Sequence, residues 1–87
     1  MAIGVQTFRG ERLTEARLAC GLYRKTLGDM LGITGSAITR YEEGQDKPLR
    51  ERVVALSDRL GFPEEFFLPI ISYDILSGST NRFPAPL

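Results

Sequence analysis

Three polar residues, Ser36, Thr39 and Arg40, have a spacing that places them on one side of a predicted short helix. Ile38 and Tyr41, three residues apart, fall on the opposite side and are expected to face the core. Polar side chains on an exposed helix face can contact base edges in a DNA major groove, where arginine to guanine is the commonest specific contact. We therefore expect Ser36 and Arg40 to read bases, and Thr39 to touch a phosphate or a base methyl.

A second interpretation of Arg40 requires no DNA. Its guanidinium could pair with Glu43 or Asp46 as an ordinary solvated surface charge. Ser36 is also ambiguous, because a serine hydroxyl both donates and accepts hydrogen bonds and so distinguishes bases poorly. Both interpretations of this helix face remain open from the residues alone.

Two helices joined by a tight turn must position these side chains. Leucines at near-helical spacing predict a first helix over 24–31, and Gly32 can take the left-handed conformation that ends a helix. Thr34 is placed to cap a second helix over 35–43 through its hydroxyl, and Gly44 stops that helix. This arrangement fits a recognition helix held away from the body of the domain by the helix before it.

Three further helices are predicted around this pair, over 10–20, from 49 or 50 to 60, and over 63–68. All five predicted elements are helical, so the expected fold class is all-α. The expected core positions are apolar side chains: Leu13, Ala16 and either Ala19 or Cys20 in the first helix, and Val53, Val54, Leu56 and Leu60 in the fourth. Leu18 falls on the face of the first helix that is expected to be exposed to solvent.

Composition excludes several kinds of site. The chain has 87 residues and no histidine, which excludes zinc sites and catalytic triads that use histidine. Its one cysteine, Cys20, cannot form an internal disulfide, and we expect an inert, partly buried thiol in a reducing compartment. Neighbouring carboxylates such as Glu42 and Glu43 point to different sides of a helix, and no glycine-rich phosphate loop occurs. We therefore predict no metal, no cofactor and no enzymatic activity.

Charge and hydropathy indicate where the chain acts. No apolar run is long enough to span a membrane and the N-terminus has no secretion signal, so we expect a cytoplasmic protein with no membrane partner. Eleven basic and eleven acidic side chains cancel overall. Residues 1–52 carry nine basic and seven acidic side chains, whereas residues 53–87 carry two and four. Such a mild asymmetry predicts modest non-specific DNA affinity that fades quickly with salt.

A family resemblance covers most of the chain, from about Phe8 to Leu68. The run LGITGSAITRYEEG, preceded by ARLACGL and followed by PLRERVVALSDRLGF, resembles the phage-repressor or Cro-type helix-turn-helix family, also called the XRE family. The resemblance implies a compact five-helix DNA-binding domain over 1–68, usually dimeric, that represses or activates promoters. Residues 69–87 then form a C-terminal extension, with an apolar segment followed by a Ser, Gly and Pro rich tail or linker.

The resemblance also implies roles for individual residues. Arg24 replaces a glutamine that usually contacts the DNA backbone, and Gly35 replaces a long side chain that usually reads a base. Arg17 and Glu42 match a structural ion pair between the first and third helices. The residues expected at the DNA backbone are Tyr23, Arg24, Lys25, Thr34, Gly35, Lys47 and Arg50, and Arg52 could extend these contacts.

The leading hypothesis is a dimeric, sequence-specific transcriptional repressor of phage, prophage or bacterial origin that inserts the helix over 35–43 into the major groove of an operator. The alternative is a protein-interaction module such as an antitoxin, using Leu18, Phe66, Phe67 and the 70–76 segment as its contact surface. A further alternative is the N-terminal half of a longer regulator with a metallopeptidase-like domain, by analogy with some family members.

Overall fold

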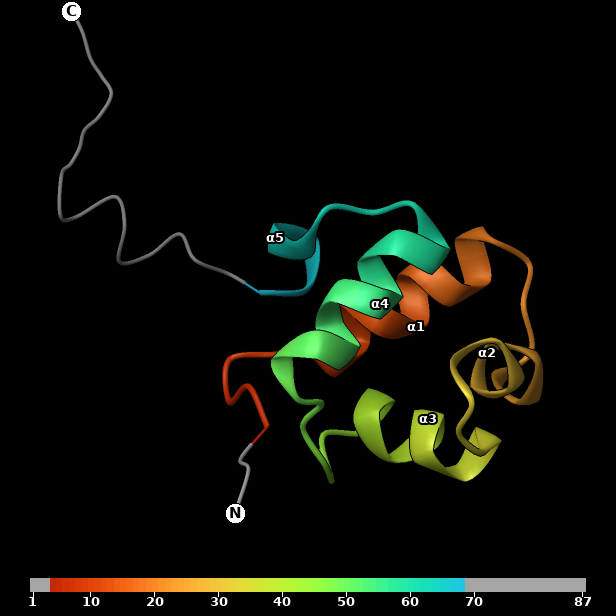
Figure 1. Cartoon of the computed structure of the whole chain (residues 1–87), viewed down its shortest axis with the longest axis horizontal. Coiled ribbons are helices and arrows are strands. Elements are labelled where there is room, and N and C mark those ends of the chain that lie inside the picture. The colour runs from red at the N-terminus through yellow and green to blue at the C-terminus, as the bar shows by residue number, and fades with distance from the viewer. Residues whose placement is uncertain (1–3, 69–87) are drawn as a thin grey trace, which may run out of the picture.

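The structure, a computed structural model, describes residues 4–68 of the 87-residue chain. Five α-helices and no strands occur in this range (Figure 1). The helices are α1 (Gly10–Ala19), α2 (Arg24–Leu31), α3 (Gly35–Glu42), α4 (Arg50–Leu60) and α5 (Glu64–Phe67). The expected all-α, five-helix fold is confirmed, with each helix end within about two residues of its prediction. None of these helices is long and apolar enough to cross a membrane.

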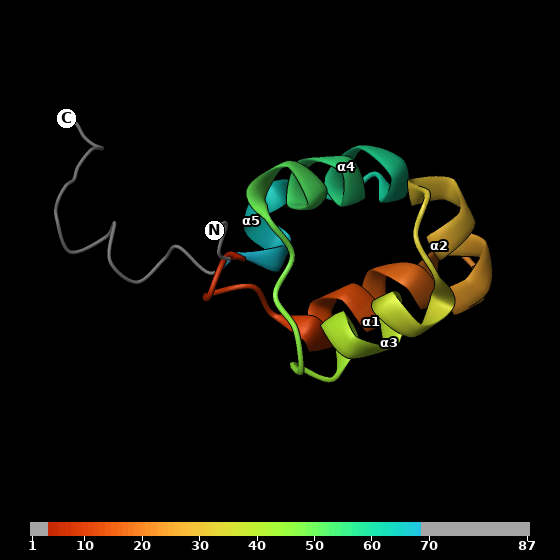
Figure 2. The same cartoon turned by 60° about the horizontal axis from the view of Figure 1, so that its bottom comes forward.

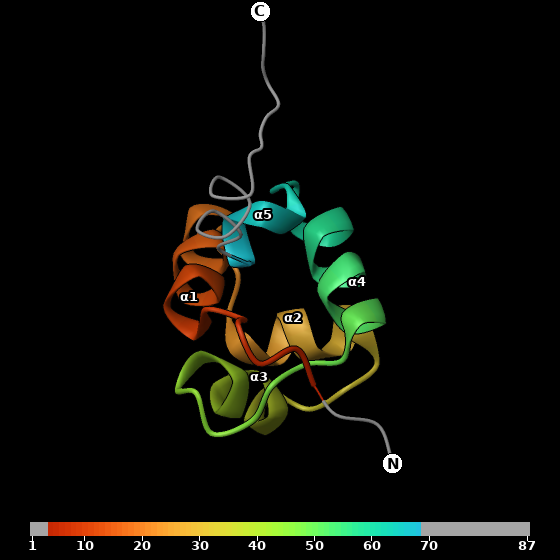
Figure 3. The same cartoon turned by 90° about the vertical axis from the view of Figure 1, so that its left-hand side faces the viewer.

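The five helices surround one core. Figure 3 shows α1 and α4 on opposite sides, with α5 at one end and α2 and α3 at the other. Figure 2, turned about a different axis, likewise separates α4 from α1. Every helix contributes buried side chains to the space between them, and Phe8 joins from the segment before α1. The buried core residues are Phe8, Leu13, Ala16, Leu27, Ile38, Val53, Leu56, Leu60 and Phe67.

Two expected core positions are wrong. Val54 is 43% exposed, because it follows the buried Val53 and therefore points about 100° further around α4. Cys20 and Ala19 are both exposed, since α1 ends at Ala19 just beyond the edge of the core. The Cys20 thiol is not partly buried as expected, although its Sγ donates a hydrogen bond to the carbonyl oxygen of Leu60 at 3.4 Å.

The expected protein-contact surface is wrong for Phe67, which is buried. Phe67 is fully buried and stacks on Phe8 with 5.9 Å between ring centroids, so it belongs to the core. Phe66 is half-buried, and the guanidinium of Arg12 lies 4.9 Å from its ring centroid. Leu18 is exposed as expected, at 62%. The 70–76 segment of that predicted surface lies outside the described residues, as does the rest of the extension.

Candidate nucleic-acid interface

The turn between α2 and α3 is held by main-chain hydrogen bonds. Gly32 has a φ of 75°, which reverses the chain at the end of α2. The Ile33 N–H then donates to the carbonyl oxygen of Gly28 at 2.8 Å. Thr34 caps α3 as predicted, because its side-chain oxygen accepts a hydrogen bond from the Ala37 N–H at 3.0 Å. The start of α3 is therefore fixed relative to α2.

One face of α3 is anchored and the other is open to solvent. Ile38 is fully buried, and Tyr41 is half-buried with its ring edge-on to Phe8 at 6.5 Å. Ser36 and Arg40 are exposed on the opposite face. Figure 1 shows α3 at one edge of the domain, with its outer side uncovered by any other described helix. The sequence-predicted division of this helix into an inner and an outer face is therefore present.

The surroundings of Arg40 do not include the carboxylate partners that the second interpretation expected. Within residues 4–68, its guanidinium forms no hydrogen bond or ion pair, so the expected alternative partners Glu43 and Asp46 are not engaged with it. Glu43 instead accepts a hydrogen bond from the Gln45 side chain at 3.2 Å. The main-chain oxygen of Arg40 accepts from the N–H groups of Gln45 and Asp46, which closes α3. The Arg40 side chain is thus free to meet an external acceptor.

Thr39 is less free than its two neighbours on this face. Its hydroxyl donates a hydrogen bond to the Gly35 carbonyl oxygen one turn earlier, at 3.2 Å. The side chain is half-buried. Because its only O–H is used within the helix, Thr39 offers a ligand an acceptor oxygen and a methyl group.

The first turn of α2 lies against the first residue of α3. A Cβ atom added to Gly35 would lie 3.2 Å from the main-chain nitrogen and Cα of Lys25. Tyr23 precedes α2, is 80% exposed and makes no side-chain cap. The Lys25 ammonium lies 3.1 Å from the Asp29 carboxylate in an exposed pair. The first turn of α2, with its exposed Lys25 side chain, therefore lies beside the start of α3.

A cluster of three charges, buried at Arg17 and Glu42 and exposed at Arg24, joins α1, α2 and α3. Arg17 Nε donates to Glu42 Oε2 at 2.6 Å, and Arg17 Nη2 donates to Glu42 Oε1 at 3.4 Å. Arg17 Nη1 donates to the Leu22 carbonyl oxygen at 2.9 Å. Arg24 Nε also donates to Glu42 Oε1, at 3.0 Å. The pairing of Arg17 with Glu42 was expected from the family resemblance, whereas the contact of Arg24 with Glu42 was not, because the resemblance implied only a DNA contact for Arg24.

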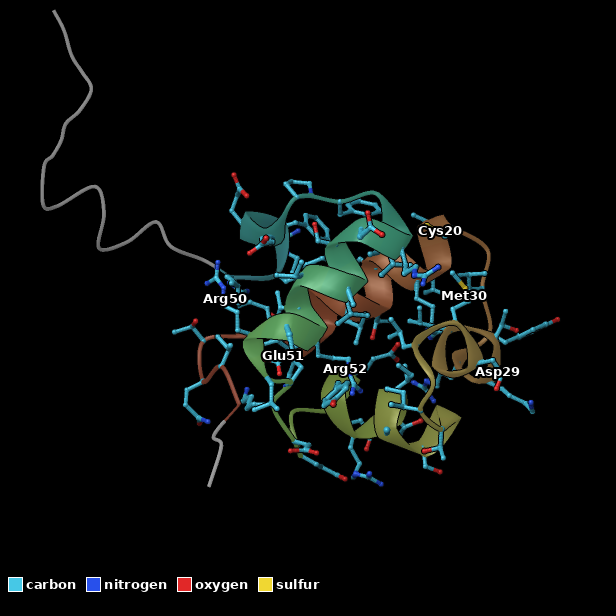
Figure 4. The ribbon with its side chains drawn as sticks, in the orientation of Figure 1. Cys20, Asp29, Met30, Arg50, Glu51 and Arg52 are labelled. Atoms are coloured by element: carbon cyan, nitrogen blue, oxygen red, sulfur yellow. The ribbon has the colours of Figure 1, made fainter. Side chains whose placement is uncertain are left out.

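The other basic residues expected at the DNA backbone have different surroundings. Lys47 Nζ donates to the carbonyl oxygen of Phe8 at 3.3 Å, which ties the segment before α1 to the loop after α3. Arg50 pairs with Glu64 of α5 at 3.2 Å. In Figure 4 Arg50 lies on the α5 side of α4, whereas Arg52 lies on the side toward α3. Arg52, named only as an extension of the contacts, is therefore nearer to α3 than Arg50.

A polar cavity of about 310 Å³ opens between the end of α3 and the start of α4. Tyr41 and Arg52 line it from the two helices, and Asp46, Lys47 and Glu51 add charges of both signs. The mixed charge makes it a poor site for an anion as it stands. Among the described residues, no three cysteine, aspartate or glutamate side chains gather as a metal site would require.

Comparisons with known proteins agree with this architecture. A family model described as a helix-turn-helix domain matches residues 10–66. A curated relative, the SPbeta prophage-derived uncharacterized HTH-type transcriptional regulator YonR of Bacillus subtilis (strain 168), is 36% identical over 59 residues. That match covers 68% of this chain and 55% of the relative, so the chain spans about half of the relative's length.

A solved structure extends the comparison to three dimensions. It is the P22 c2 repressor protein in complex with synthetic operator 9T in the presence of Tl⁺, and it aligns with a TM-score of 0.64 at 30% identity. The alignment covers 68% of this chain and 89% of the repressor chain. The chain belongs to the helix-turn-helix domain family and has the fold of a phage repressor.

Proposed function

We propose that this domain is a sequence-specific DNA-binding transcriptional regulator of the repressor type, working in the cytoplasm. The observation that carries the proposal is the exposed side chain of Arg40 on the outer face of α3, opposite the buried Ile38. Similarity to a prophage-derived transcriptional regulator and to a repressor in complex with a synthetic operator supports the same conclusion.

The proposed base contacts come from the outer face of α3. Arg40 would donate to guanine in the major groove, and Ser36 would contact a neighbouring base edge. Thr39 would contribute its methyl group to a thymine, or its oxygen to a donor, because its O–H is already used by Gly35. Gly35 has no side chain with which to read a base, and its position lets the main chain of α3 come close to a phosphate.

The proposed backbone contacts come mainly from the first turn of α2. Tyr23, Arg24 and Lys25 are exposed beside the start of α3 and would bind phosphates, which fixes the register of the domain on the duplex. Thr34 would contribute through its position at the α3 N-terminus. Lys47 and Arg50 would each have to share an existing internal contact with a phosphate, so their contribution is expected to be smaller.

The proposed assembly is a homodimer on a near-palindromic operator. A helix-turn-helix dimer places its two recognition helices in successive major grooves, with half-site centres about 34–36 Å apart. The exposed Leu18 and the extension after Leu68 are candidates for contacts with a second copy or another protein. Removing residues 69–87 distinguishes these roles, because loss of the dimer with intact folding would assign the extension to self-association.

Selection of bound duplexes from a random DNA pool at a stated salt concentration tests the proposal. Sedimentation of the resulting complex then gives its stoichiometry. The proposal predicts an enriched motif with two related halves and two protein chains per duplex. Recovery of unenriched sequences at every salt concentration would contradict sequence-specific binding, whereas an enriched motif bound by one chain would contradict only the dimer.

A further inference from the structure

The cluster around Glu42 contains two arginines with different degrees of exposure. The Glu42 side chain is 1% exposed and that of Arg17 is 9% exposed, whereas the Arg24 side chain is 44% exposed. Arg17 uses all three of its nitrogen atoms within the protein, on Glu42 and on the Leu22 carbonyl oxygen. Arg17 and Glu42 therefore form the buried half of the cluster, and Arg24 forms its solvent-facing half.

The hydrogen bond to Glu42 uses only one edge of Arg24. Its Nε donates to Glu42 Oε1, and within residues 4–68 neither of its terminal Nη atoms has a partner. A guanidinium is planar, and its five N–H groups have fixed directions. Holding the Nε edge against a buried carboxylate therefore limits the directions in which the two Nη groups can point.

The path of the Arg24 side chain follows the boundary between α2 and α3. Arg24 is the first residue of α2, and its guanidinium reaches Glu42, the last residue of α3. At the other end of this boundary, Gly35 lies against the main chain of Lys25. The exposed part of Arg24 is thus held beside the helix whose outer face carries Arg40.

The charges of the cluster leave one positive charge uncompensated. One carboxylate faces two guanidinium groups, and Arg17 is the more deeply buried of the two arginines. The excess charge therefore lies on the exposed Arg24, where a phosphate can form charge-assisted hydrogen bonds with Nη1 and Nη2. A side chain already held in place also loses less conformational freedom on binding.

We propose that Glu42 is a positioning residue for DNA binding, which holds Arg24 by its Nε edge so that its terminal amino groups meet a backbone phosphate. This inference rests on the proposed function and adds a second role to Glu42 beyond its pairing with Arg17. Glu42 itself touches no DNA. Its effect on affinity is transmitted through Arg24.

A double-mutant cycle with Glu42→Gln and Arg24→Gln tests the inference on the duplex selected by the unchanged chain. Glu42→Gln raises the net charge by one, which alone would strengthen binding to DNA. We instead expect it to weaken affinity about fivefold to tenfold, and Arg24→Gln to weaken it by a similar factor. Arg24→Gln should also reduce the slope of log affinity against log salt by about 0.9, the value for one lost phosphate contact. In the Arg24→Gln background, Glu42→Gln should cause no further loss.

Glu43→Gln is the matched control. Glu43 is the exposed neighbour of Glu42, and its replacement makes the same change of charge without touching Arg24. It should leave affinity unchanged or raise it. Affinity that is unchanged or higher in Glu42→Gln would overturn the inference. The same fold-loss in both Arg24 backgrounds would also overturn it, because Glu42 would then act through Arg17 or the fold alone.

Arg24→Lys keeps the inference testable if Glu42→Gln does not fold, as urea denaturation would show. This variant leaves Arg17 paired with Glu42 and keeps the charge, but replaces the planar fork by a single ammonium. We expect a loss of about fivefold in affinity, and binding equal to that of the unchanged chain would overturn the inference. If the unchanged chain selects no duplex, the proposed function fails and this inference with it. If the unchanged chain selects a duplex but Glu42→Gln and Arg24→Gln weaken its binding independently of each other, only the positioning role of Glu42 is contradicted.

Discussion

Gly28 lies against the main chain of Thr34, the residue that caps α3. A Cβ atom added to Gly28 would lie 2.8 Å from the carbonyl carbon of Thr34 and 2.9 Å from its oxygen. Real Cβ atoms do not approach main-chain atoms this closely, and main-chain atoms in a hydrogen-bonded turn cannot easily move aside. This contact sets the separation of α2 from the start of the proposed recognition helix.

Gly28→Ala should therefore destabilise the domain, because overpacking usually costs about 1–3 kcal/mol. Alanine brings a gain of about 1 kcal/mol in helix propensity, so the net loss should reach up to about 2 kcal/mol. Urea denaturation followed by circular dichroism measures the difference. Gly35→Ala is the control, because its added Cβ would lie 3.2 Å from its nearest neighbours and should cost less. Equal losses for the two variants would show that the contact is not responsible.

Arg17→Met should destabilise the fold strongly. It removes two N–H groups from the Glu42 carboxylate, which is buried and would retain only Arg24 on its solvent side. Breaking a buried pair by removing one partner costs about 3–5 kcal/mol. Arg59→Met, in the exposed last turn of α4, should stay within about 0.5 kcal/mol of the unchanged chain. If Arg17→Met lost no more stability than Arg59→Met, the pair of Arg17 and Glu42 would contribute nothing to the stability of the fold.

Glu11 gives the stability of the domain a small dependence on pH. Hydrogen bonds from the Arg9 guanidinium, at 2.8 and 2.9 Å, are the main cause that holds the pKa of Glu11 below its usual value of 4.5. A lowered pKa in the folded state stabilises the fold above the usual pKa, and this contribution is lost as the pH falls through the folded-state value. Because the Glu11 side chain is 60% exposed, the contribution should not exceed about 0.2–1 kcal/mol.

Glu11→Gln should consequently be slightly less stable than the unchanged chain at neutral pH, and the difference should vanish on acidification. Urea midpoints measured across the acidic range test this prediction. Arg9→Gln should also remove this pH dependence, because it removes the guanidinium that lowers the pKa of Glu11. A stability difference that stays constant with pH would assign the effect of Glu11→Gln to helix propensity.

Lys25 and Lys47 should behave differently, although the same contact with the DNA backbone was expected of both. The Lys25 side chain is 82% exposed, so Lys25→Gln should reduce the slope of log affinity against log salt by about 0.9 without affecting folding. Lys47 donates to the Phe8 carbonyl oxygen, and Lys47→Gln should cost about 1.5–3 kcal/mol of stability with a smaller change of slope. Salt titrations of DNA binding and urea denaturation together separate the two effects.

The sequence predicted the elements whose signals are local. Glycine stops, the Thr34 cap and apolar spacing each depend on a few adjacent residues, and they placed all five helices. The inner and outer faces of α3 also followed from spacing within one helix. Burial was predicted wrongly at Cys20, which follows the last residue of α1, and at Val54, which directly follows the buried Val53.

The contacts that could not be predicted from the sequence join residues far apart in the chain. Arg24 and Glu42 are separated by 18 positions, and Lys47 and Phe8 by 39. Charge type and periodicity carry no information about such pairs, because any exposed basic residue on α2 could serve DNA equally well. Only the packing of α2 against α3 and of the N-terminal segment against the loop after α3 brings these groups together.

The DNA-binding specificity of the Arg40→Ala variant tests most directly whether the outer face of α3 reads bases. Affinities for the selected duplex and for random duplex should be measured for this variant and for the unchanged chain at one salt concentration. If Arg40 on the outer face of α3 reads a base, the variant should lose about 1–3 kcal/mol on the selected duplex, with a smaller loss on random DNA and relaxed preference at one base pair. An equal loss on both duplexes, with preference unchanged at every position, would contradict base reading by this helix.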